Sequence, residues 1–330
     1  MSVSTIAMSL LPGFGSLGMG ATVCFVVLRL VQSACFGGEI GVATTYVAEM
    51  SPRKAGAACG ILFGLLGFGV VLAGGVNAVI HAAFAQEFAD FDGWRVAFFF
   101  GGVLGVVGYF VRGALEETPA FAAMKETTQH APLLQLLRDH RLALGVGIGL
   151  SAATGVVNGV LFAYLPAFLP TFGRISSSYS ALILFAATVF NAAGVILIGY
   201  ISDKTSWIKL HRLGCFGTLL AIVPVLGGLA SGVVNPLVWV LLFAAGAATI
   251  NGCIGQLLAD IFPTAARASG ITISYNLSAA IFQGLTPLAA TVAIRATGSP
   301  LSPAILVAVG LLLAMASGLW CKKIGGHLLA

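Results

Sequence analysis

Charged residues are scarce in this sequence. Asp, Glu, Lys and Arg make up 8% of the 330 residues, and hydrophobic residues make up 58%, whereas a soluble globular chain carries about 25% charged residues. The mean hydropathy is +1.02. Water cannot be the main solvent of a chain with so little charge. The composition therefore excludes an ordinary soluble globular protein and indicates an integral membrane protein.

Clusters of metal-binding or catalytic residues are also lacking. The six cysteines are dispersed in or beside apolar segments without a CxxC pair, and the five histidines are scattered. This pattern supports neither a disulfide framework nor a metal site, so we expect no cofactor. A membrane-embedded enzyme usually needs several such residues at membrane depth, and we therefore do not expect an enzyme. Nor does the net charge of +5 indicate nucleic-acid binding, because it comes from the loops between apolar segments.

Long apolar runs, by contrast, are abundant. A membrane-spanning helix needs about 20 mostly apolar residues. The sequence predicts nine full spans, at 20–47, 58–84, 94–113, 142–168, 179–201, 213–231, 236–260, 269–294 and 302–321. The opening stretch from Ser4 to Leu11 is apolar but about half the required length, and it lacks the basic region and cleavage site of a signal peptide. We predict an all-α membrane bundle of nine spans plus an N-terminal half-helix stub.

Glycines four residues apart favour close packing of these helices, because small residues let helix backbones approach in lipid. The pairs are Gly60 and Gly64, Gly101 and Gly105, Gly145 and Gly149, and Gly155 and Gly159.

The basic residues of the loops predict the orientation. Twelve Lys and Arg residues fall on one side of the predicted spans and three, Arg95, Arg174 and Arg295, on the other. By the positive-inside rule the side with twelve is cytoplasmic, which places the C-terminus inside the cell and the chain in the plasma (inner) membrane. The twelve are Arg53, Lys54, Arg112, Lys125, Arg138, Arg141, Lys204, Lys209, Arg212, Arg267, Lys322 and Lys323.

One long polar stretch, from Glu116 to Arg141, interrupts the hydrophobic pattern. It predicts a cytoplasmic linker at 114–141, partly an interfacial amphipathic helix. The linker separates residues 1–113, with the stub and three spans, from residues 142–330, with six spans. Large secondary transporters are commonly built from two related halves. We therefore expect a transporter with a complete C-terminal half and an N-terminal half that lacks two spans and most of a third.

Arg29 and Glu39 are charged residues well inside one predicted span. At 100° per residue, Arg29, Gln32, Phe36 and Glu39 lie within about an 80° arc of one helix. A charge in hydrocarbon costs at least ~2.5–3.5 kcal/mol, so it faces a partner or a water-filled cavity. The stripe is either a charge network that locks neighbouring helices or a site for a substrate anion or a coupling proton.

Polar stripes also mark the second half. Asn158 shares a face with Ser151 and Thr154, and Asn191 shares a face with Thr188. In the span at 269–294 a further stripe lies beside Tyr275, and we expect Pro287 to break that helix. This stripe consists of Thr272, Asn276, Gln283 and Thr286. Each amide could join neighbouring helices, at about 0.6 kcal/mol apiece, or the stripes could line a hydrated path together.

Several motifs carry a family resemblance. Arg29-Leu-Val-Gln32 resembles the RxxQG element of major facilitator superfamily transporters, with Ser33 in place of glycine. The run from Arg29 to Gly41, followed by Tyr46-Val-Ala-Glu49, resembles the metabolite:proton symporters, a branch with osmolyte, dicarboxylate, citrate and shikimate permeases. Later elements of that branch are similar to Asp92-Gly-Trp-Arg-Val-Ala-Phe98, Leu115-Glu-Glu-Thr-Pro-Ala-Phe121, Tyr164-Leu-Pro-Ala-Phe168, Phe262-Pro-Thr-Ala-Ala-Arg-Ala-Ser-Gly270, Tyr275-Asn276 and Thr286-Pro287. Gly199-Tyr-Ile-Ser-Asp203-Lys204 resembles the family's GxxxD[RK]xG[RK] loop, although Ser206-Trp207 replaces the later part.

The resemblance implies proton-coupled symport of a small organic acid or osmolyte by alternating access. Its partners would be a carboxylate or zwitterionic solute, protons and the lipid bilayer, without nucleic acid. Arg29, with Gln32, would bind a substrate carboxylate or modulate the pKa of a nearby carboxyl, and Glu39 would carry a proton or pair with an arginine. The second-half wall would consist of Asn158, Tyr164, Asn191, Tyr275, Asn276 and Gln283. The cytoplasmic gating residues would be Glu49, Arg53, Asp203, Lys204 and Arg267.

Two other functions stay open. The missing spans favour a non-transporting remnant, or a subunit that needs a separate N-terminal fragment. A drug/proton antiporter is less favoured, because the span at 58–84 carries Gly67-Phe-Gly-Val-Val-Leu-Ala-Gly-Gly75 without the proline of the GPxxGG element found in exporters of this superfamily.

Overall fold

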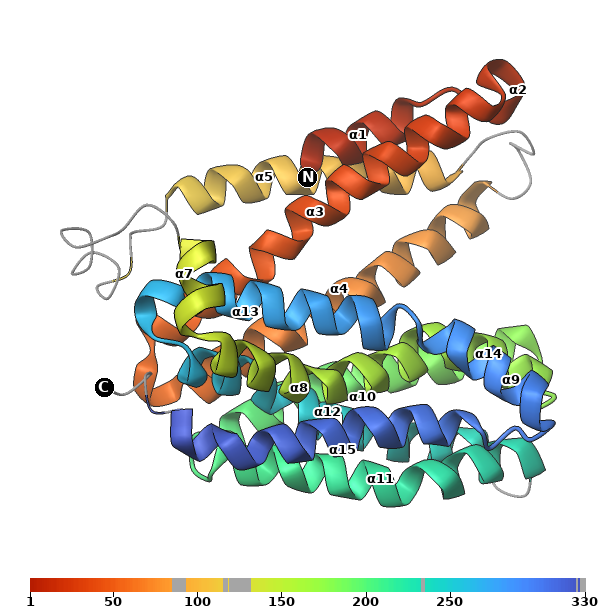
Figure 1. Ribbon diagram of the computed structural model, residues 1–330. Helices are drawn as coiled ribbons and strands as arrows, with labels where there is room; N and C mark the ends of the chain where they lie inside the picture. The colour runs from red at the N-terminus through yellow and green to blue at the C-terminus, as the bar shows by residue number, and fades with distance from the viewer. Residues whose placement is uncertain (85–92, 115–117, 119–131, 233–234, 325, 327–330) are drawn as a thin grey trace. The chain divides into compact units, whose positions relative to one another are not determined.

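The computed structural model describes residues 1–330 except 85–92, 115–117, 119–131, 233–234, 325 and 327–330. Within the described residues every regular element is a helix, which confirms the all-α prediction (Figure 1). In chain order the elements are α1 (Ser2–Leu10), α2 (Phe14–Leu17), α3 (Met19–Met50), η1 (Pro52–Lys54), α4 (Ala55–Phe84), α5 (Gly93–Gly113), α7 (Pro132–Asp139), α8 (Arg141–Asn158), η2 (Gly159–Tyr164), α9 (Leu165–Thr171), α10 (Ser177–Ser202), α11 (Trp207–Ser231), α12 (Pro236–Ile261), α13 (Thr264–Ser278), η3 (Ala279–Gln283), α14 (Thr286–Thr297) and α15 (Pro303–Ile324).

The described residues contain nine helical runs that are long and apolar enough to cross a membrane. Each run overlaps one predicted span, so the nine spans are confirmed. In lipid only a helix or a closed barrel satisfies every backbone polar group, so a long apolar run has few alternatives. The runs are Met19–Met50, Pro52–Val76, Gly93–Gly113, Arg141–Thr171, Ser177–Ser202, Trp207–Ser231, Pro236–Ile261, Thr264–Thr297 and Pro303–Cys321.

Contacts divide the chain into two compact units. The first consists of Met1–Ile40 with Gly69–Glu117, and the second of Gly41–Phe68 with Thr118–Ala330. The predicted linker falls largely on 115–117 and 119–131, outside the described residues, and its end forms α7. The division into transporter halves at 113 and 142 stays a prediction.

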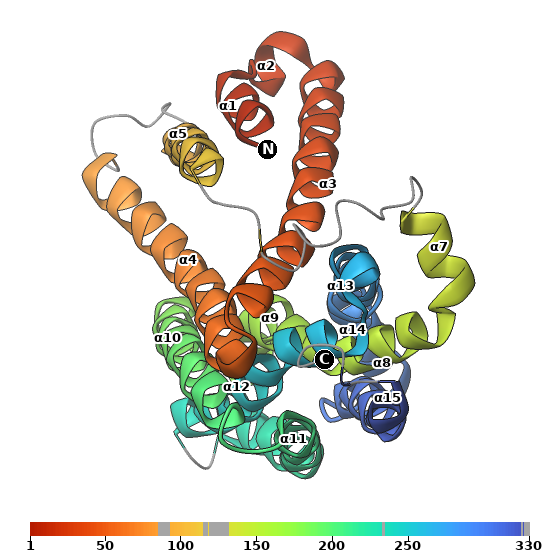
Figure 2. The same cartoon turned by 90° about the vertical axis from the view of Figure 1, so that its left-hand side faces the viewer.

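In the first unit, α1 packs along α5, as both views of the ribbon show (Figures 1 and 2). Ile6 and Ser2 of α1 occupy the space that a Cβ atom on Gly102 or Gly105 of α5 would need. Two small residues on one face of α5 therefore allow the close approach. Of the predicted pair, Gly105 lies at this contact, but Gly101 faces open space and Gly102 takes its place.

Aromatic side chains join α3 to the start of α5 in the same unit. The ring of Trp94 lies 6.0 Å from that of Phe25 and 5.6 Å from that of Phe98, both edge to face. The neighbouring Arg95 donates a hydrogen bond of 3.1 Å to the carbonyl of Ser9. These contacts tie the ends of α1, α3 and α5 together.

The core of the second unit is apolar and continuous. It draws buried residues from α8, η2, α9, α10, α11, α12, α14 and α15, among them Phe168, Ile222, Phe243 and Leu311. Seen close to end-on, the helices of this unit gather around that core (Figure 2). The tightest packing joins α12 to α10 and α11, and α8 to α15.

Glycines also set the approach of α4 to α10 in this unit. A Cβ atom on Gly60 would lie 2.8 Å from the Cα atom of Gly199, and one on Gly64 would meet Ile196. The predicted Gly60 and Gly64 pair therefore lies on a helix contact. In the pair on α8, Gly149 packs against Ser317 and Gly145 faces open space.

Two π-helical segments interrupt long helices of the second unit. α8 continues as η2 after Asn158, and α13 continues as η3 after Ser278. Gly155 and Gly159 allow the two π-helical regions to pack closely, because a Cβ atom on either glycine would collide with η3 or with the start of α14. The predicted break at Pro287 is confirmed: α14 begins at Thr286 with Pro287 in its first turn, where no backbone N–H is needed. π-helical turns occur frequently at functional sites.

Candidate functional site

Arg29 begins a chain of polar side chains in the first unit. Its Nη1 atom donates a hydrogen bond of 2.5 Å to Oε1 of Gln32, and Nε2 of Gln32 donates one of 2.7 Å to Oγ1 of Thr5. Arg29 is exposed, and Gln32 is half-buried. The guanidinium is thus oriented by a neutral amide, and its charge has no carboxylate partner among the described residues of this unit.

Glu39 pairs with Arg112, and not with Arg29, the cation of its own predicted stripe. Both of its carboxylate oxygens accept hydrogen bonds from Arg112 near the end of α5, at 2.8 and 3.2 Å. The side chain of Glu39 is 28% exposed and that of Arg112 is 61% exposed. Arg112, which the sequence placed at the edge of a loop, therefore belongs to the charged site on α3 and α5.

A buried ion pair joins α3 to α13 in the second unit. Nη1 of Arg267 lies 2.6 Å from Oε1 of Glu49, with only 2% and 4% of the two side chains exposed. The other carboxylate oxygen accepts a hydrogen bond of 2.6 Å from Oγ1 of Thr118. Nε of Arg267 donates to the carbonyls of Ala259 and Phe262, at 2.9 and 3.3 Å. Such pairs are stable in a dry environment only when their remaining donors and acceptors are satisfied, as they are here.

Asp203 caps the start of α4. Its two carboxylate oxygens accept hydrogen bonds of 2.7 Å from the N–H of Gly56 and 2.9 Å from that of Ala57. The first N–H groups of a helix have no partner inside the helix and carry partial positive charge, so a carboxylate is well placed there. A Cβ atom on residue 56 would lie 2.6 Å from the carboxylate, which explains the glycine.

The other two predicted gating residues, Arg53 and Lys204, are exposed. Nζ of Lys204 lies 4.4 Å from the centre of the Tyr200 ring, a cation–π contact. Arg53 is exposed in η1. Their roles in gating stay predictions.

An amide pair lies where α8 changes to η2. Nδ2 of Asn251 on α12 donates a hydrogen bond of 2.8 Å to Oδ1 of Asn158, and Oδ1 of Asn251 is buried without a partner in the described structure. Asn251 was missed in the sequence because the residues three and four positions away on either side are Ala, Ile or Gly, so it forms no polar stripe. A polar residue within a membrane-length run was the available signal.

Asn191 and Tyr164 lie inside packed helix interfaces. Asn191 is 4% exposed and donates a hydrogen bond of 3.2 Å to the carbonyl of Ala244, joining α10 to α12. Tyr164 is also 4% exposed and belongs to the hydrophobic core, with its ring 5.4 Å from that of Phe168. Its hydroxyl has no partner within the described residues.

The predicted stripe on α13 and η3 remains partly accessible. Tyr275, Asn276 and Gln283 are all half-buried. The Tyr275 ring lies 5.7 Å from that of Phe63 on α4, and Asn276 donates a hydrogen bond of 2.8 Å to the carbonyl of Thr272. Gln283 ends η3, beside Gly159.

Several buried hydroxyls near these amides have no hydrogen-bond partner in the described residues. They belong to Ser151, Thr154, Ser274 and Ser278. Buried polar groups are nearly always satisfied by protein or water, so unpaired ones call for a water molecule or a ligand. The hydroxyls of Ser151 and Thr154 lie on the face that the sequence predicted to be polar.

The described residues contain no group of three or more His, Cys, Asp or Glu side chains that could hold a metal ion.

Comparison with known proteins decides the family. The model of the Major Facilitator Superfamily matches residues 1–287, most of the chain. The chain belongs to the Major Facilitator Superfamily. The resemblance stated from the motifs is thereby confirmed.

Curated relatives are named as transporters of proline, betaine or ectoine. The chain is 30% identical over 328 residues to the ectoine/proline transporter ProP of Corynebacterium glutamicum, an alignment that covers 93% of this chain and 64% of that one. It is 29% identical over 337 residues to the proline/betaine transporter of Salmonella typhimurium, covering 98% and 67% of the two chains. This superfamily chain thus spans about two thirds of the length of the curated relatives it matches.

Solved structures agree on the fold. The proton:xylose symporter XylE, bound to 6-bromo-6-deoxy-D-glucose, matches with a TM-score of 0.74 at 18% identity, covering 98% of this chain and 79% of that one. The fold is therefore that of the superfamily, and the nine membrane-length helical runs among the described residues belong to a multi-pass membrane protein.

Proposed function

We propose that this chain takes part in proton-coupled symport of a small zwitterionic or carboxylate solute across the plasma membrane. The observation that carries the proposal is Arg29, a cation on a membrane-length helix whose guanidinium is held by the neutral amide of Gln32. A cation at such a position is expensive unless it faces water or an anion. A solute carboxylate supplies that anion.

The chemistry of Arg29 suits a carboxylate. Guanidinium groups bind carboxylates through two parallel hydrogen bonds, and charge-assisted bonds are about twice as strong as neutral ones. Gln32 and Thr5 fix the guanidinium in position. The relatives' names support the choice, because proline, betaine and ectoine all carry a carboxylate together with a positive nitrogen.

Glu39 supplies the coupling proton's site. Its carboxylate pairs with Arg112 at 2.8 Å while remaining partly exposed, so a proton can reach it. Protonation removes the negative charge and releases Arg112 from α3. A contact that depends on protonation can therefore change the packing of α3 against α5 during transport.

In this proposal the ion pair of Glu49 with Arg267 forms a gate. The hydrogen bonds from the start of α4 to Asp203 form a second contact of the same gate. Alternating access moves the two halves of such a transporter against each other around a central site. The ion pair connects α3 from one predicted half to α13 from the other. Opening on that side has to break it, so its strength sets how long the gate stays closed.

A binding experiment tests the solute, with the chain purified in detergent and radiolabelled proline or glycine betaine as the probe. We expect saturable binding that falls roughly ten- to a hundredfold in Arg29→Gln, since a charged hydrogen bond contributes about 1.5–3 kcal/mol. Arg295→Gln, which removes an exposed cation from α14, is the matched control. Absence of saturable binding by the folded wild type, or equal binding by both variants, would contradict the proposal.

Uptake into liposomes tests the coupling. With an alkaline interior we expect solute accumulation that a protonophore abolishes. Glu39→Gln should retain solute binding and lose proton-driven accumulation. The exchanged pair, Glu39→Arg with Arg112→Glu, is the control: if Glu39 serves only to hold Arg112, this double variant should restore proton-driven accumulation. Solute-driven proton movement in the opposite direction would favour an antiporter.

A further inference from the structure

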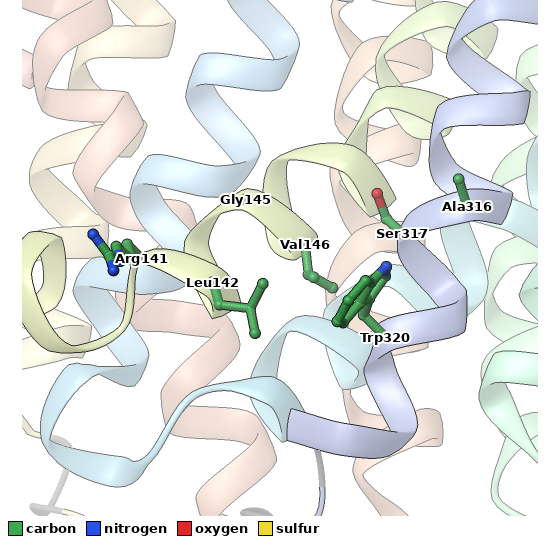
Figure 3. A pocket seen from close by; sticks show the side chains of 7 residues that line it. All are labelled: Arg141, Leu142, Gly145, Val146, Ala316, Ser317 and Trp320. Carbon is green, nitrogen blue, oxygen red and sulfur yellow. The ribbon is translucent and has the colours of Figure 1, made fainter.

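A cleft opens between the start of α8 and the end of α15, both in the second unit. Its volume is about 260 Å³, and it is lined by Arg141, Leu142, Gly145, Val146, Ala316, Ser317 and Trp320. Figure 3 shows Leu142, Val146 and Trp320 between the two helices, with Arg141 at the first turn of α8 and Ser317 one turn before Trp320. None of these residues belongs to the solute or gating sites described above.

Glycine spacing on α8 shapes this cleft. At Gly149 the two helices are in contact, because a Cβ atom there would collide with Ser317. One turn earlier, a Cβ atom on Gly145 would meet nothing within 4 Å. The helices therefore touch at Gly149 and separate toward Arg141, and the missing side chain at Gly145 leaves the wedge between them open.

The walls of the cleft are apolar, and one end is cationic. Leu142 and Trp320 are exposed in the described structure, and in a membrane-spanning bundle such a surface faces lipid. Nζ of Lys323 lies 4.8 Å from the centre of the Trp320 ring, which places a second cation on the α15 side of the cleft, while Arg141 lies on the α8 side. The lining has no acidic residue to neutralise either charge.

This combination matches the border between acyl chains and headgroups. Trp is enriched at membrane interfaces, where its ring sits at headgroup level, and basic pockets between helices bind anionic lipid headgroups. The volume lies just below the range of about 300–1,000 Å³ for sites that enclose a small molecule. It suits part of one acyl chain better than a complete soluble ligand.

We propose that the cleft binds an anionic phospholipid. One acyl chain lies against Leu142, Val146 and Trp320, and the headgroup phosphate accepts hydrogen bonds from Arg141 and Lys323. The phosphate replaces the water that the two cations otherwise bind, and the chain fills the wedge that Gly145 leaves open. The lipid then connects the start of α8 to the end of α15.

Native mass spectrometry of the purified full chain tests this proposal, with phosphatidylglycerol and phosphatidylcholine of identical chains as probes. We expect the wild type to retain phosphatidylglycerol in preference, and each of Arg141→Gln and Lys323→Gln to lower its retention about fivefold, in line with one cation near an anionic surface. Arg138→Gln is the control, because Arg138 is an exposed cation on α7 outside the cleft. It should leave retention unchanged.

A second variant separates the cleft from general charge attraction. Gly145→Leu keeps both cations and fills the open space, so it should abolish the preference while circular dichroism and the melting temperature stay unchanged. Equal retention of the two lipids by the wild type would overturn the proposal, as would wild-type retention by Gly145→Leu. Displacement of phosphatidylglycerol by millimolar inorganic phosphate would overturn it too, because the site would then recognise the anion alone.

Discussion

Glu49 and Arg267, 218 residues apart in the chain, form an ion pair of 2.6 Å from which solvent is almost wholly excluded. The pair lies between the end of α3 and the first turns of α13, and its remaining polar atoms contact Thr118 and the carbonyls of Ala259 and Phe262. Loss of one partner therefore leaves the other as an unpaired charge among satisfied groups.

We predict that Arg267→Met destabilises the protein by about 3–5 kcal/mol, the cost of an uncompensated buried charge. Glu49→Gln combined with Arg267→Met should recover part of this loss, because no charge then stays behind. Thermal or denaturant melts in detergent of the wild type, Arg267→Met, Glu49→Gln and the double variant give the coupling energy between the two side chains. The control is Arg53→Gln, which removes an exposed cation close by in the chain; equal melting of Arg53→Gln and Arg267→Met would contradict the prediction.

Asp203 should stabilise the start of α4. We expect Asp203→Ala to cost about 1–2 kcal/mol, because it removes both an N-terminal cap and a favourable charge at the helix end. Asp203→Asn should cost less, since the amide oxygen still accepts one hydrogen bond. Lys204→Met is the matched control on the neighbouring residue. Hydrogen exchange at the amides of Gly56 and Ala57 measures the effect locally, and unchanged exchange in Asp203→Ala would rule out the cap.

The close contact of α4 with α10 gives a prediction about two glycines. Gly60→Ala should destabilise the protein by about 1–3 kcal/mol, because the added Cβ would lie 2.8 Å from the Cα atom of Gly199 and the helices must separate. Gly69→Ala on the same helix meets nothing within 4 Å and should be neutral or slightly stabilising, as alanine favours helix. Equal melting temperatures for the two variants would show that the contact does not set the packing.

Orientation in the membrane follows from the basic loops and can be tested directly. In a chain with Ser at the two exposed cysteines, Cys24 and Cys35, Ser177→Cys should react with an impermeant maleimide in intact cells. Thr205→Cys, also at an exposed position, should react only after the cells are opened. The reverse pattern would invert the predicted topology.

The positions of the helices could be predicted from the sequence because a membrane offers few alternatives. A run of about 20 apolar residues has to satisfy its backbone within itself, so the run predicts a helix without knowledge of its neighbours. Pro287 likewise marks a helix start through its own covalent geometry, because it has no N–H to donate. The motif around Arg29 identified the family for a similar reason, since it is contiguous in the chain.

Burial was harder to predict. The predicted spans at 179–201 and 213–231 leave His211 outside the membrane helices, but α11 begins at Trp207 and His211 is completely buried. Tyr164, expected along the solute path, lies in the hydrophobic core. A helix face becomes buried or exposed according to which helices pack on it, and that depends on distant parts of the chain.

The sequence by itself predicted each membrane-length helical run among the described residues, apart from its exact ends, and the family of this protein, because these depend on local hydrophobicity and contiguous motifs. Only the tertiary structure decided which charged and polar side chains meet. It pairs Glu39 with Arg112, Glu49 with Arg267 and Asn158 with Asn251. Each pair joins two helices, and periodicity fixes the face of one helix without naming the residue on the helix that packs against it.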